Sequence, residues 1–179
     1  MDNFYESDQL FLQKIKLSDI DEAFMEWFSD EELMRYYTNS RRKITHEDII
    51  NSIEEGEKNN NCFTYGIFYK ETGACIGTIK LGPINWIHKI SDLVVLIGNR
   101  NYHGKGLAVE AIKLGNRLAF ESYDIRKLFG GMYESNIASI KAYTRAGWVI
   151  EGKLKGHYLN NGLPEDRILV GCFNPKYFK

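Results

Sequence analysis

The chain has 179 residues, of which 44% are hydrophobic and 13% aromatic, and its formal net charge at pH 7 is −1. This composition excludes a disordered chain, and the balanced charge excludes the basic face that general nucleic-acid binding requires. The length and the lack of a low-complexity tract favour a single domain over residues 1–179. No run reaches the ~20 apolar residues of a membrane span, and residues 1–6 do not start a signal peptide, so we expect a cytoplasmic protein without a membrane partner.

The first third of the chain predicts a strand followed by helices. Residues 10–15 are apolar and extended in character, and the apolar residues after them are spaced for one face of a helix. Each expected helix has a capping signal at its N-terminus: in turn Ser18-Asp19, Asp30 for a short helix through Tyr37, and Thr45 with Asp48 for residues 49–57. We expect this part to form a helical flap.

From residue 62 onward the pattern changes to strands, first as an antiparallel meander and then in alternation with helices. The predicted strands are 62–69, 74–81, 90–98, 127–132, 149–158 and 167–173, and the predicted helices are 107–120 and 137–146. Asn160-Asn161-Gly162 is a turn that joins the last two strands as a hairpin. The order predicts an α/β fold, with a mixed, mostly antiparallel central sheet flanked by helices on both sides.

The cysteine pattern predicts neither a disulfide framework nor a zinc site. Cys62, Cys75 and Cys172 are odd in number, widely spaced and set in apolar runs. Disulfide frameworks and zinc sites use paired or closely repeated cysteines, which this spacing lacks. We therefore predict three buried thiols of the core and expect no metal.

The segment 101–108 joins the apolar run 93–98 directly to the helix that begins near Leu107. A strand that runs through a loop with Gly104 and Gly106 into a helix leaves unpaired backbone N–H groups at the positive helix end. Those groups face one small volume that suits a pyrophosphate. The segment therefore predicts a bound phosphorylated cofactor.

A second motif spans residues 136–148. Asn136 and Tyr143 are seven positions apart, or two helical turns, so both side chains lie on one face of the predicted helix and can address the same extended ligand. By themselves, Asn136 would be interpreted as a helix cap and Tyr143 as a core tyrosine.

The order of elements together with these motifs resembles the GNAT superfamily of acyl-CoA-dependent N-acyltransferases, from about Leu10 to Phe173. Its loop motif [Q/R]-x-x-G-x-[G/A] matches at both glycines but has Asn101 at its first position, for which the neighbouring Arg100 is a candidate to compensate. The segment 136–148 resembles the superfamily's N-x-x-[AS]-x-x-x-Y-x-x-x-G-[FW]. The resemblance implies acetyl-CoA or another short acyl-CoA as cosubstrate.

The resemblance also implies roles for individual residues. The expected cofactor-binding loop comprises Asn101, His103, Gly104, Lys105, Gly106 and Leu107. Lys105, Lys141 and Arg145 are candidates for contacts with the phosphates of the cofactor. Asn136 would contact the pantetheine arm, the Tyr143 hydroxyl would lie near the thioester sulfur, and a strand amide near Leu96 or Ile97 would point at the thioester carbonyl. In some relatives that modify protein N-termini a serine acts at the position of Ser139, although a small packing residue is the simpler interpretation of Ser139.

Transfer to an amine requires a neutral nucleophile, an N–H donor for the oxyanion and a proton for the departing sulfur. Tyr143, with a reference pKa near ~10, suits a thiol leaving group of roughly 8.5 and is our predicted general acid. The base stays open among four side chains, namely Asp92, His88, His157 and Glu151. We take Asp92 and Ser139, with Tyr143, as the catalytic candidates. Glu110 is interpreted as a carboxylate that stabilises the start of a helix.

The acceptor is a small-molecule amine in our interpretation. Aromatic residues in the regions expected to hold it, with the basic run Arg41-Arg42-Lys43, favour an anionic aromatic compound; these are Trp27, Tyr36, Tyr37, Trp86 and Tyr158. A wider resemblance to ribosomal-protein N-terminal, polyamine and amino-sugar acyltransferases leaves three acceptors open. We expect the amine of a nucleotide-linked amino sugar, with a protein N-terminus second and a polyamine third. A non-catalytic acyl-CoA-binding module is the alternative from another class, and we expect a monomer or homodimer.

Overall fold

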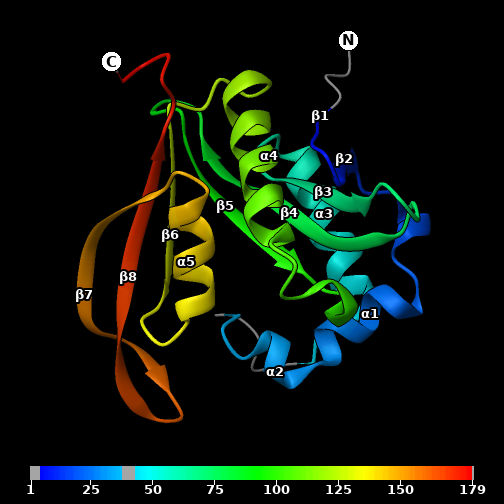
Figure 1. The fold of residues 1–179 in the computed structure, drawn as a ribbon, viewed down its shortest axis with the longest axis horizontal. Coiled ribbons are helices and arrows are strands. Elements are labelled where there is room, and N and C mark those ends of the chain that lie inside the picture. The colour runs from blue at the N-terminus through cyan, green and yellow to red at the C-terminus, as the bar shows by residue number, and fades with distance from the viewer. Residues whose placement is uncertain (1–4, 38–42, 179) are drawn as a thin grey trace.

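Within residues 5–37 and 43–178, which the computed structural model describes, eight strands form one sheet in the order β1-β2-β3-β4-β5-β6-β8-β7 (Figure 1). The strands are β1 (Tyr5–Glu6), β2 (Leu10–Lys14), β3 (Phe63–Tyr69), β4 (Cys75–Asn85), β5 (Ile90–Ile97), β6 (Lys127–Tyr133), β7 (Val149–Asn160) and β8 (Leu163–Phe173). Strands β5 and β6 pair in parallel, while the other neighbouring strands described here pair antiparallel. The predicted mixed, mostly antiparallel sheet is confirmed.

Helices cover both faces of this sheet, as predicted. The helical elements are η1 (Leu17–Asp19), α1 (Glu22–Ser29), α2 (Glu31–Met34), α3 (His46–Lys58), η2 (Arg100–Tyr102), α4 (Leu107–Glu121) and α5 (Ile137–Arg145). Helices α4 and α5 lie together on one face, whereas α3 lies on the other face against β3 and β4 (Figure 1). No helix among the described residues is both long and apolar enough to cross a membrane.

Two of the three capping signals act as predicted. The Thr45 side chain accepts a hydrogen bond from the Asp48 amide and completes a capping box at α3, and Asp30 caps α2 through the amides of Glu32 and Leu33. The prediction for Ser18-Asp19 is wrong, because these residues form the 3-10 turn η1 and Asp21 caps α1 instead. The sequence does not distinguish Asp19 from Asp21 as the cap, because both aspartates satisfy the local rule.

Helix α4 supplies the centre of the core. Its four predicted apolar positions are all buried, namely Leu107, Ala111, Leu114 and Leu118. Gly115 lets the helix approach β5 closely, because a Cβ atom there would lie 3.1 Å from a methyl group of Leu93. This contact sets the close spacing between α4 and β5.

Strands β5 and β6 separate part-way along their length. They pair at Ile90 with Lys127, Ser91 with Leu128 and Asp92 with Phe129, after which no further pairing joins them in the described residues. β5 continues to Ile97 and β6 to Tyr133. Beyond these three pairs, the edges of β5 and β6 that face each other have no strand partner. We call this opening the β5–β6 gap.

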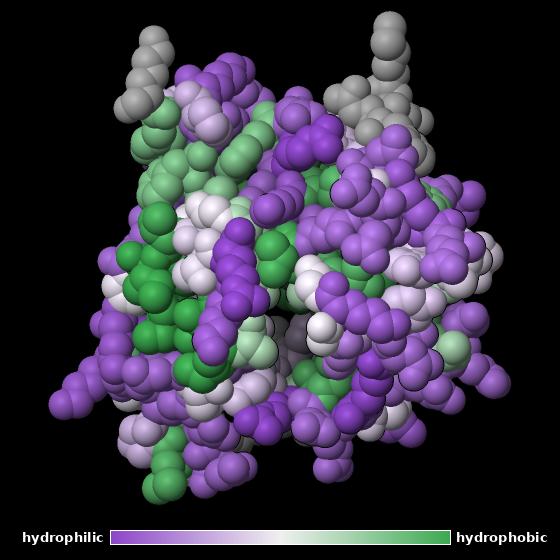
Figure 2. Space-filling model, viewed as in Figure 1, coloured by the Kyte–Doolittle hydropathy of each residue, from purple (hydrophilic) through white to green (hydrophobic). Residues whose placement is uncertain are grey.

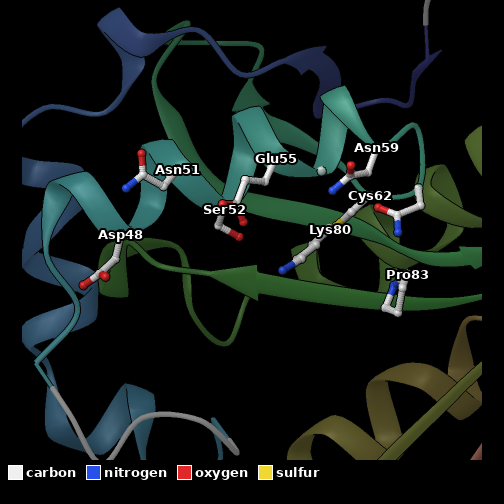
Figure 3. A pocket seen from close by; sticks show the side chains of 10 residues that line it. Asp48, Asn51, Ser52, Glu55, Asn59, Cys62, Lys80 and Pro83 are labelled. Carbon is white, nitrogen blue, oxygen red and sulfur yellow. The ribbon is translucent and has the colours of Figure 1, made fainter.

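The cysteines only partly match the prediction of buried thiols. Cys172 is buried, but Cys62 and Cys75 are half-buried, and all three are free thiols. Cys62 follows α3 and lines a cavity of about 440 Å³ between α3 and β4 (Figure 3). The expectation of three core residues is therefore wrong for Cys62, which faces this space.

Candidate active site

A cavity of about 380 Å³ lies at the β5–β6 gap, and we call it the central cavity. Because the two strands have parted, residues from both faces of the sheet line it. Asn136, Ser139 and Tyr143 reach it from α5, whereas Tyr37, Lys80 and Asp92 reach it from the α3 face. Figure 2 shows the surface hollowed between α5 and the N-terminal end of α4. The cavity thus connects the two faces of the sheet.

Tyr143 closes the exposed backbone of β5 at the gap. Its hydroxyl donates to the Leu93 carbonyl at 2.8 Å and accepts from the Val95 amide at 3.2 Å. The ring packs edge-on against Trp148 at 4.8 Å, and only 8% of the residue is exposed. Burial, with a further contribution from the Asp92 charge, raises the pKa of Tyr143 well above its usual value. The phenol therefore stays protonated, but it is a weaker acid than the reference value used in the sequence analysis implies.

Asp92 occupies the last paired position of β5, on the α3 face of the gap. Burial raises the pKa of Asp92 to about 6, against the lowering influence of the Leu93 amide and of the positive charges on Arg167 and Lys80. A carboxylate that titrates near neutrality is well suited to accept and release a proton. Of the four candidates for the base, Asp92 is the one that lines the central cavity.

The other three candidates have surroundings that explain them without catalysis. His88 lies in the exposed turn between β4 and β5, where its amide donates to the Asn85 side chain. Glu151 forms an ion pair with Lys127 at 2.6 Å. His157 is exposed on β7 and accepts a 3.3 Å hydrogen bond from Arg167. The geometry therefore favours Asp92.

The backbone of β5 alternates between β4 and the gap. The Gly98 amide bonds to the Ile76 carbonyl at 2.9 Å, so even-numbered residues of β5 turn their amides toward β4 and odd-numbered residues turn theirs toward the gap. The Val95 contact with Tyr143 agrees with this alternation. The expectation that the Leu96 amide points into the site is therefore wrong, although Leu96 is among the residues that line the central cavity.

Ile97 keeps its backbone on the gap side, and its carbonyl accepts a 2.7 Å hydrogen bond from the His103 ring. This bond anchors the loop that follows β5. Sequence reasoning missed Val95, whose amide also faces the gap. A two-residue alternation would have predicted Val95 had the register of β5 against β4 been known.

The loop between η2 and α4 has the form that a diphosphate site requires. Gly104 and Gly106 adopt φ angles of 74° and 79°, and nothing lies within 4 Å of the positions where their Cβ atoms would stand. Gly106 is the N-cap of α4, so the first amides of the helix emerge beside this open space. The residues present thus fit the diphosphate of coenzyme A.

The remaining loop residues contribute less directly. The Asn101 amide donates to its neighbour Asn99, and the Lys105 ammonium lies over the Tyr102 ring at 5.2 Å. Arg100 does not substitute for the expected side chain at position 101, because its guanidinium is paired with Asp30 and Glu32 beside α2. Lys141 and Arg145 lie exposed on α5. Glu110 bonds to Ser7 and Gln9 and links α4 to the turn between β1 and β2, consistent with a structural role.

Asn136 and Ser139 open helix α5 at the edge of the central cavity. The Asn136 side chain accepts a 3.2 Å hydrogen bond from the Ser139 amide as the N-cap of the helix. Both residues, together with Tyr143, line the cavity along one side of α5, as their spacing predicted. The cap and a ligand contact are compatible for Asn136, since its amide nitrogen is not used in the cap.

Three of the five predicted acceptor-site aromatics line the cavity. Tyr36, Tyr37 and Tyr158 do so, whereas Trp27 is buried in a cluster with Phe24. Trp86 lies in the turn between β4 and β5 and donates to the Asn60 carbonyl at 2.7 Å. The basic residues Arg41 and Arg42 lie outside the described residues, and Lys43 is exposed. In the described part of the chain no group of three or more His, Cys, Asp or Glu side chains is arranged to hold a metal ion.

The cavity also contains two cationic residues, Lys80 and Arg167, that were not among the predicted site residues. Lys80 stands alone among apolar neighbours in β4, and Arg167 enters from β8. A single charge within an apolar strand is a signal that can be recognised, but nothing in the sequence places β4 and β8 on either side of one cavity. That arrangement depends on the strand order.

The site combines a glycine loop at the start of a helix with a cavity where two strands separate. Comparisons with known proteins identify a family for this chain. The acetyltransferase (GNAT) domain family matches residues 9–149. The chain belongs to this family. The chain is 27% identical over 154 residues to the probable N-acetyltransferase YjcK of Bacillus subtilis (strain 168), and this match covers 85% of this chain and 82% of that protein. It is therefore an N-acetyltransferase that uses an acyl-CoA donor.

Two solved structures share the fold. Spermidine N-acetyltransferase from Vibrio cholerae, in complex with CoA and spermine, superposes with a TM-score of 0.85 at 20% identity, over 97% of this chain and 100% of that one. Ribosomal-protein-S5-alanine acetyltransferase from Vibrio fischeri gives a TM-score of 0.81 at 22% identity, over 99% of this chain and 100% of that one. At these identities the likeness concerns the fold alone.

We expect the substitution Gly104→Val to weaken acetyl-CoA binding at least about 10-fold, because a side chain would fill the space where the diphosphate lies against backbone amides. Gly162→Val is the matched control, since Gly162 has a φ of 81° and equally open space but lies at the tip of the β7–β8 hairpin. Calorimetric titration with acetyl-CoA measures both. Equal affinities in the two variants would reject this loop as the diphosphate site.

Proposed function

We propose that this N-acetyltransferase holds the diphosphate of acetyl-CoA at the loop before α4 and receives a small primary amine from the α3 face of the central cavity. The observation that carries the proposal is that one cavity joins Tyr143 on the α5 side to Asp92 on the α3 side through the β5–β6 gap. Bound acetyl-CoA supplies an activated thioester carbonyl and a thiol leaving group.

The residues of this chain perform the proton transfers in this proposal. Asp92 accepts the proton of the incoming ammonium, directly or through a water, so that the amine is neutral when it attacks. The Tyr143 hydroxyl would turn from the Leu93 carbonyl to give its proton to the sulfur as the C–S bond breaks. It would regain a proton from the amine nitrogen, which loses its second proton once the C–N bond has formed, and an odd-numbered amide of β5 would stabilise the carbonyl oxygen. Asn136 and Ser139 position the arm that lies between the loop and the gap.

The acceptor is proposed only as a small primary amine. By their descriptions, the two structural relatives act on spermidine and on the alanine of a ribosomal protein. The nucleotide-linked amino sugar expected from the sequence has no counterpart in either description, and it stays a prediction without support from these relatives. A protein N-terminus and a polyamine stay in the set to be tested.

We expect the purified chain to release free CoA thiol from acetyl-CoA when a suitable amine is added. The panel comprises spermidine, a peptide that begins with alanine and a nucleotide-linked amino sugar, with acetyl-CoA alone as the control for hydrolysis. A thiol-reactive dye follows the rate, and mass spectrometry identifies the acetylated product. Tight binding of acetyl-CoA with no thiol release for any amine would instead support a non-catalytic binding module.

A further inference from the structure

The guanidinium of Arg167 lies in the wall of the central cavity, in a space that depends on the glycine at position 131. On β8 it pairs with Tyr133 of β6. The guanidinium lies over Gly131, where a Cβ atom would stand 2.0 Å from Nε. The strand β7 bulges opposite, with Gly156 at a φ of 60°, and brings the Tyr158 ring to 5.6 Å from the guanidinium carbon. The missing side chain at Gly131 therefore makes the room that Arg167 occupies.

The charge of Arg167 is not neutralised within the described part of the chain. Its Nη1 donates to His157 at 3.3 Å, but no carboxylate lies within 4.0 Å, and its buried Nε–H has no acceptor. Other cations such as the exposed Arg100 and the half-buried Lys127, by contrast, do have carboxylate partners. A partly buried guanidinium without an anion is costly, and its planar fork matches carboxylate and phosphate groups. An oxyanion on a ligand would supply the partner that Arg167 lacks among these residues.

Lys80 adds a second cation on the other side of the gap. It projects from β4 and lines both the central cavity and the cavity beneath α3 (Figure 3). Asp92 lies close enough to both cations for their charges to lower its pKa, yet it forms no ion pair within 4.0 Å with either in the described residues. One carboxylate thus faces two cations, and the residues that line the cavity favour a ligand with negative charge.

Building on the proposed function, we propose that the acceptor is a primary amine that also carries a carboxylate or a phosphate, and that Arg167, assisted by Lys80, binds that group. The amine then points toward Asp92 and the gap, while the anionic group lies against the guanidinium. Arg167 is in this view the residue that determines acceptor specificity.

A polyamine would require negatively charged side chains in the same cavity. Its distal ammonium groups would have to pass Lys80 to reach carboxylates such as Glu55 of α3 in the neighbouring cavity (Figure 3). Like charges at short range inside a cavity oppose that path. A polycationic acceptor is therefore the competing outcome, and the experiment below separates the two.

The test compares amines that differ only in the anionic group. Lysine and cadaverine differ by a carboxylate, phosphoethanolamine and ethanolamine differ by a phosphate, and spermidine represents the polycation. With acetyl-CoA saturating, we expect the kcat/KM for at least one anionic member to exceed that of its partner by at least about 10-fold, as a charge-assisted contact implies. The pair in which the two kcat/KM values differ shows whether the bound group is a carboxylate or a phosphate.

Two variants assign the effect to Arg167. Arg167→Gln and Gly131→Ala, which displaces the guanidinium, are expected to lower kcat/KM for the anionic member by about 10- to 100-fold through KM. The kcat/KM for the amine that lacks the anionic group should change less than about twofold, which is much less than the loss of one charge-assisted contact would cause. Arg117→Gln on the outer face of α4 is the matched control and should leave both members unchanged.

Equal kcat/KM within both pairs, a preference for spermidine, or equal losses for both members in Arg167→Gln would overturn the inference. The proposed function fails separately, by the lack of thiol release from any amine despite acetyl-CoA binding. In that event calorimetric titration of phosphoethanolamine against ethanolamine, and of lysine against cadaverine, into the CoA-saturated protein decides the inference. Equal binding of the two members in both pairs would then reject it.

Discussion

Replacement of Tyr143 by phenylalanine is expected to lower kcat by about 10- to 10⁴-fold, with little change in acetyl-CoA affinity. The phenol is the proposed proton donor to the departing sulfur, and burial keeps it protonated because the pKa of Tyr143 is raised. The diphosphate loop lies elsewhere on the chain, so cofactor binding does not depend on the hydroxyl. Steady-state kinetics and a calorimetric titration measure the two effects separately.

The same substitution carries a structural cost that the experiment must separate from catalysis. It leaves the Leu93 carbonyl and the Val95 amide without the Tyr143 hydroxyl, which costs about 1–3 kcal/mol of stability for a buried group. Tyr65→Phe is the matched control, because it likewise removes a tyrosine hydroxyl, one that is half-buried and bonded to the Tyr123 hydroxyl at 2.7 Å. We expect Tyr65→Phe to lower the free energy of unfolding but not kcat. An unchanged kcat in Tyr143→Phe would remove this residue from the mechanism.

The parts of the fold that were predicted correctly depend on short-range signals. The capping box of Thr45 and Asp48, the apolar stripe of α4 from Leu107 and the spacing of Asn136 and Tyr143 each lie within a few helical turns. Local hydrogen bonding and side-chain periodicity determine these features, so the sequence displays them directly. The loop with Gly104 and Gly106 belongs to the same class, because a positive φ favours glycine.

The parts that were missed depend on contacts between distant strands. The β5–β6 gap, the odd-numbered amides of β5 and the joint presence of Lys80 and Arg167 all follow from strand order and register. A shift of one residue in register would turn Leu96 rather than Val95 toward the gap, and no local pattern distinguishes these alternatives. The acceptor side of the site was for this reason the least predictable from sequence.

Asp92→Asn is expected to lower kcat/KM by about 10²- to 10⁴-fold, because the proposed base can no longer accept a proton from the ammonium. In the unmodified protein, activity should fall as the pH drops below about 6, where Asp92 becomes protonated. Asp8→Asn on the exposed turn after β1 makes the same chemical change away from the cavity and should not alter the rate. A pH–rate profile of kcat/KM measures this, and an unshifted acid limb in Asp92→Asn would assign it to another group.

Asp92→Asn is expected to raise the stability of the fold at neutral pH, although it lowers the activity. Burial raises the pKa of Asp92 from 3.8 to about 6, so between these values the folded chain retains a proton that the unfolded chain has lost. The folded state is then progressively destabilised as the pH rises through this range, by up to about 3 kcal/mol at neutral pH. Asparagine is neutral at every pH and avoids that cost. Denaturant unfolding should therefore show the variant more stable than the unmodified protein at pH 7.5 and similar to it at pH 4. Lower stability of the variant at pH 7.5 would mean that Arg167 and Lys80 stabilise the carboxylate by more than its burial costs.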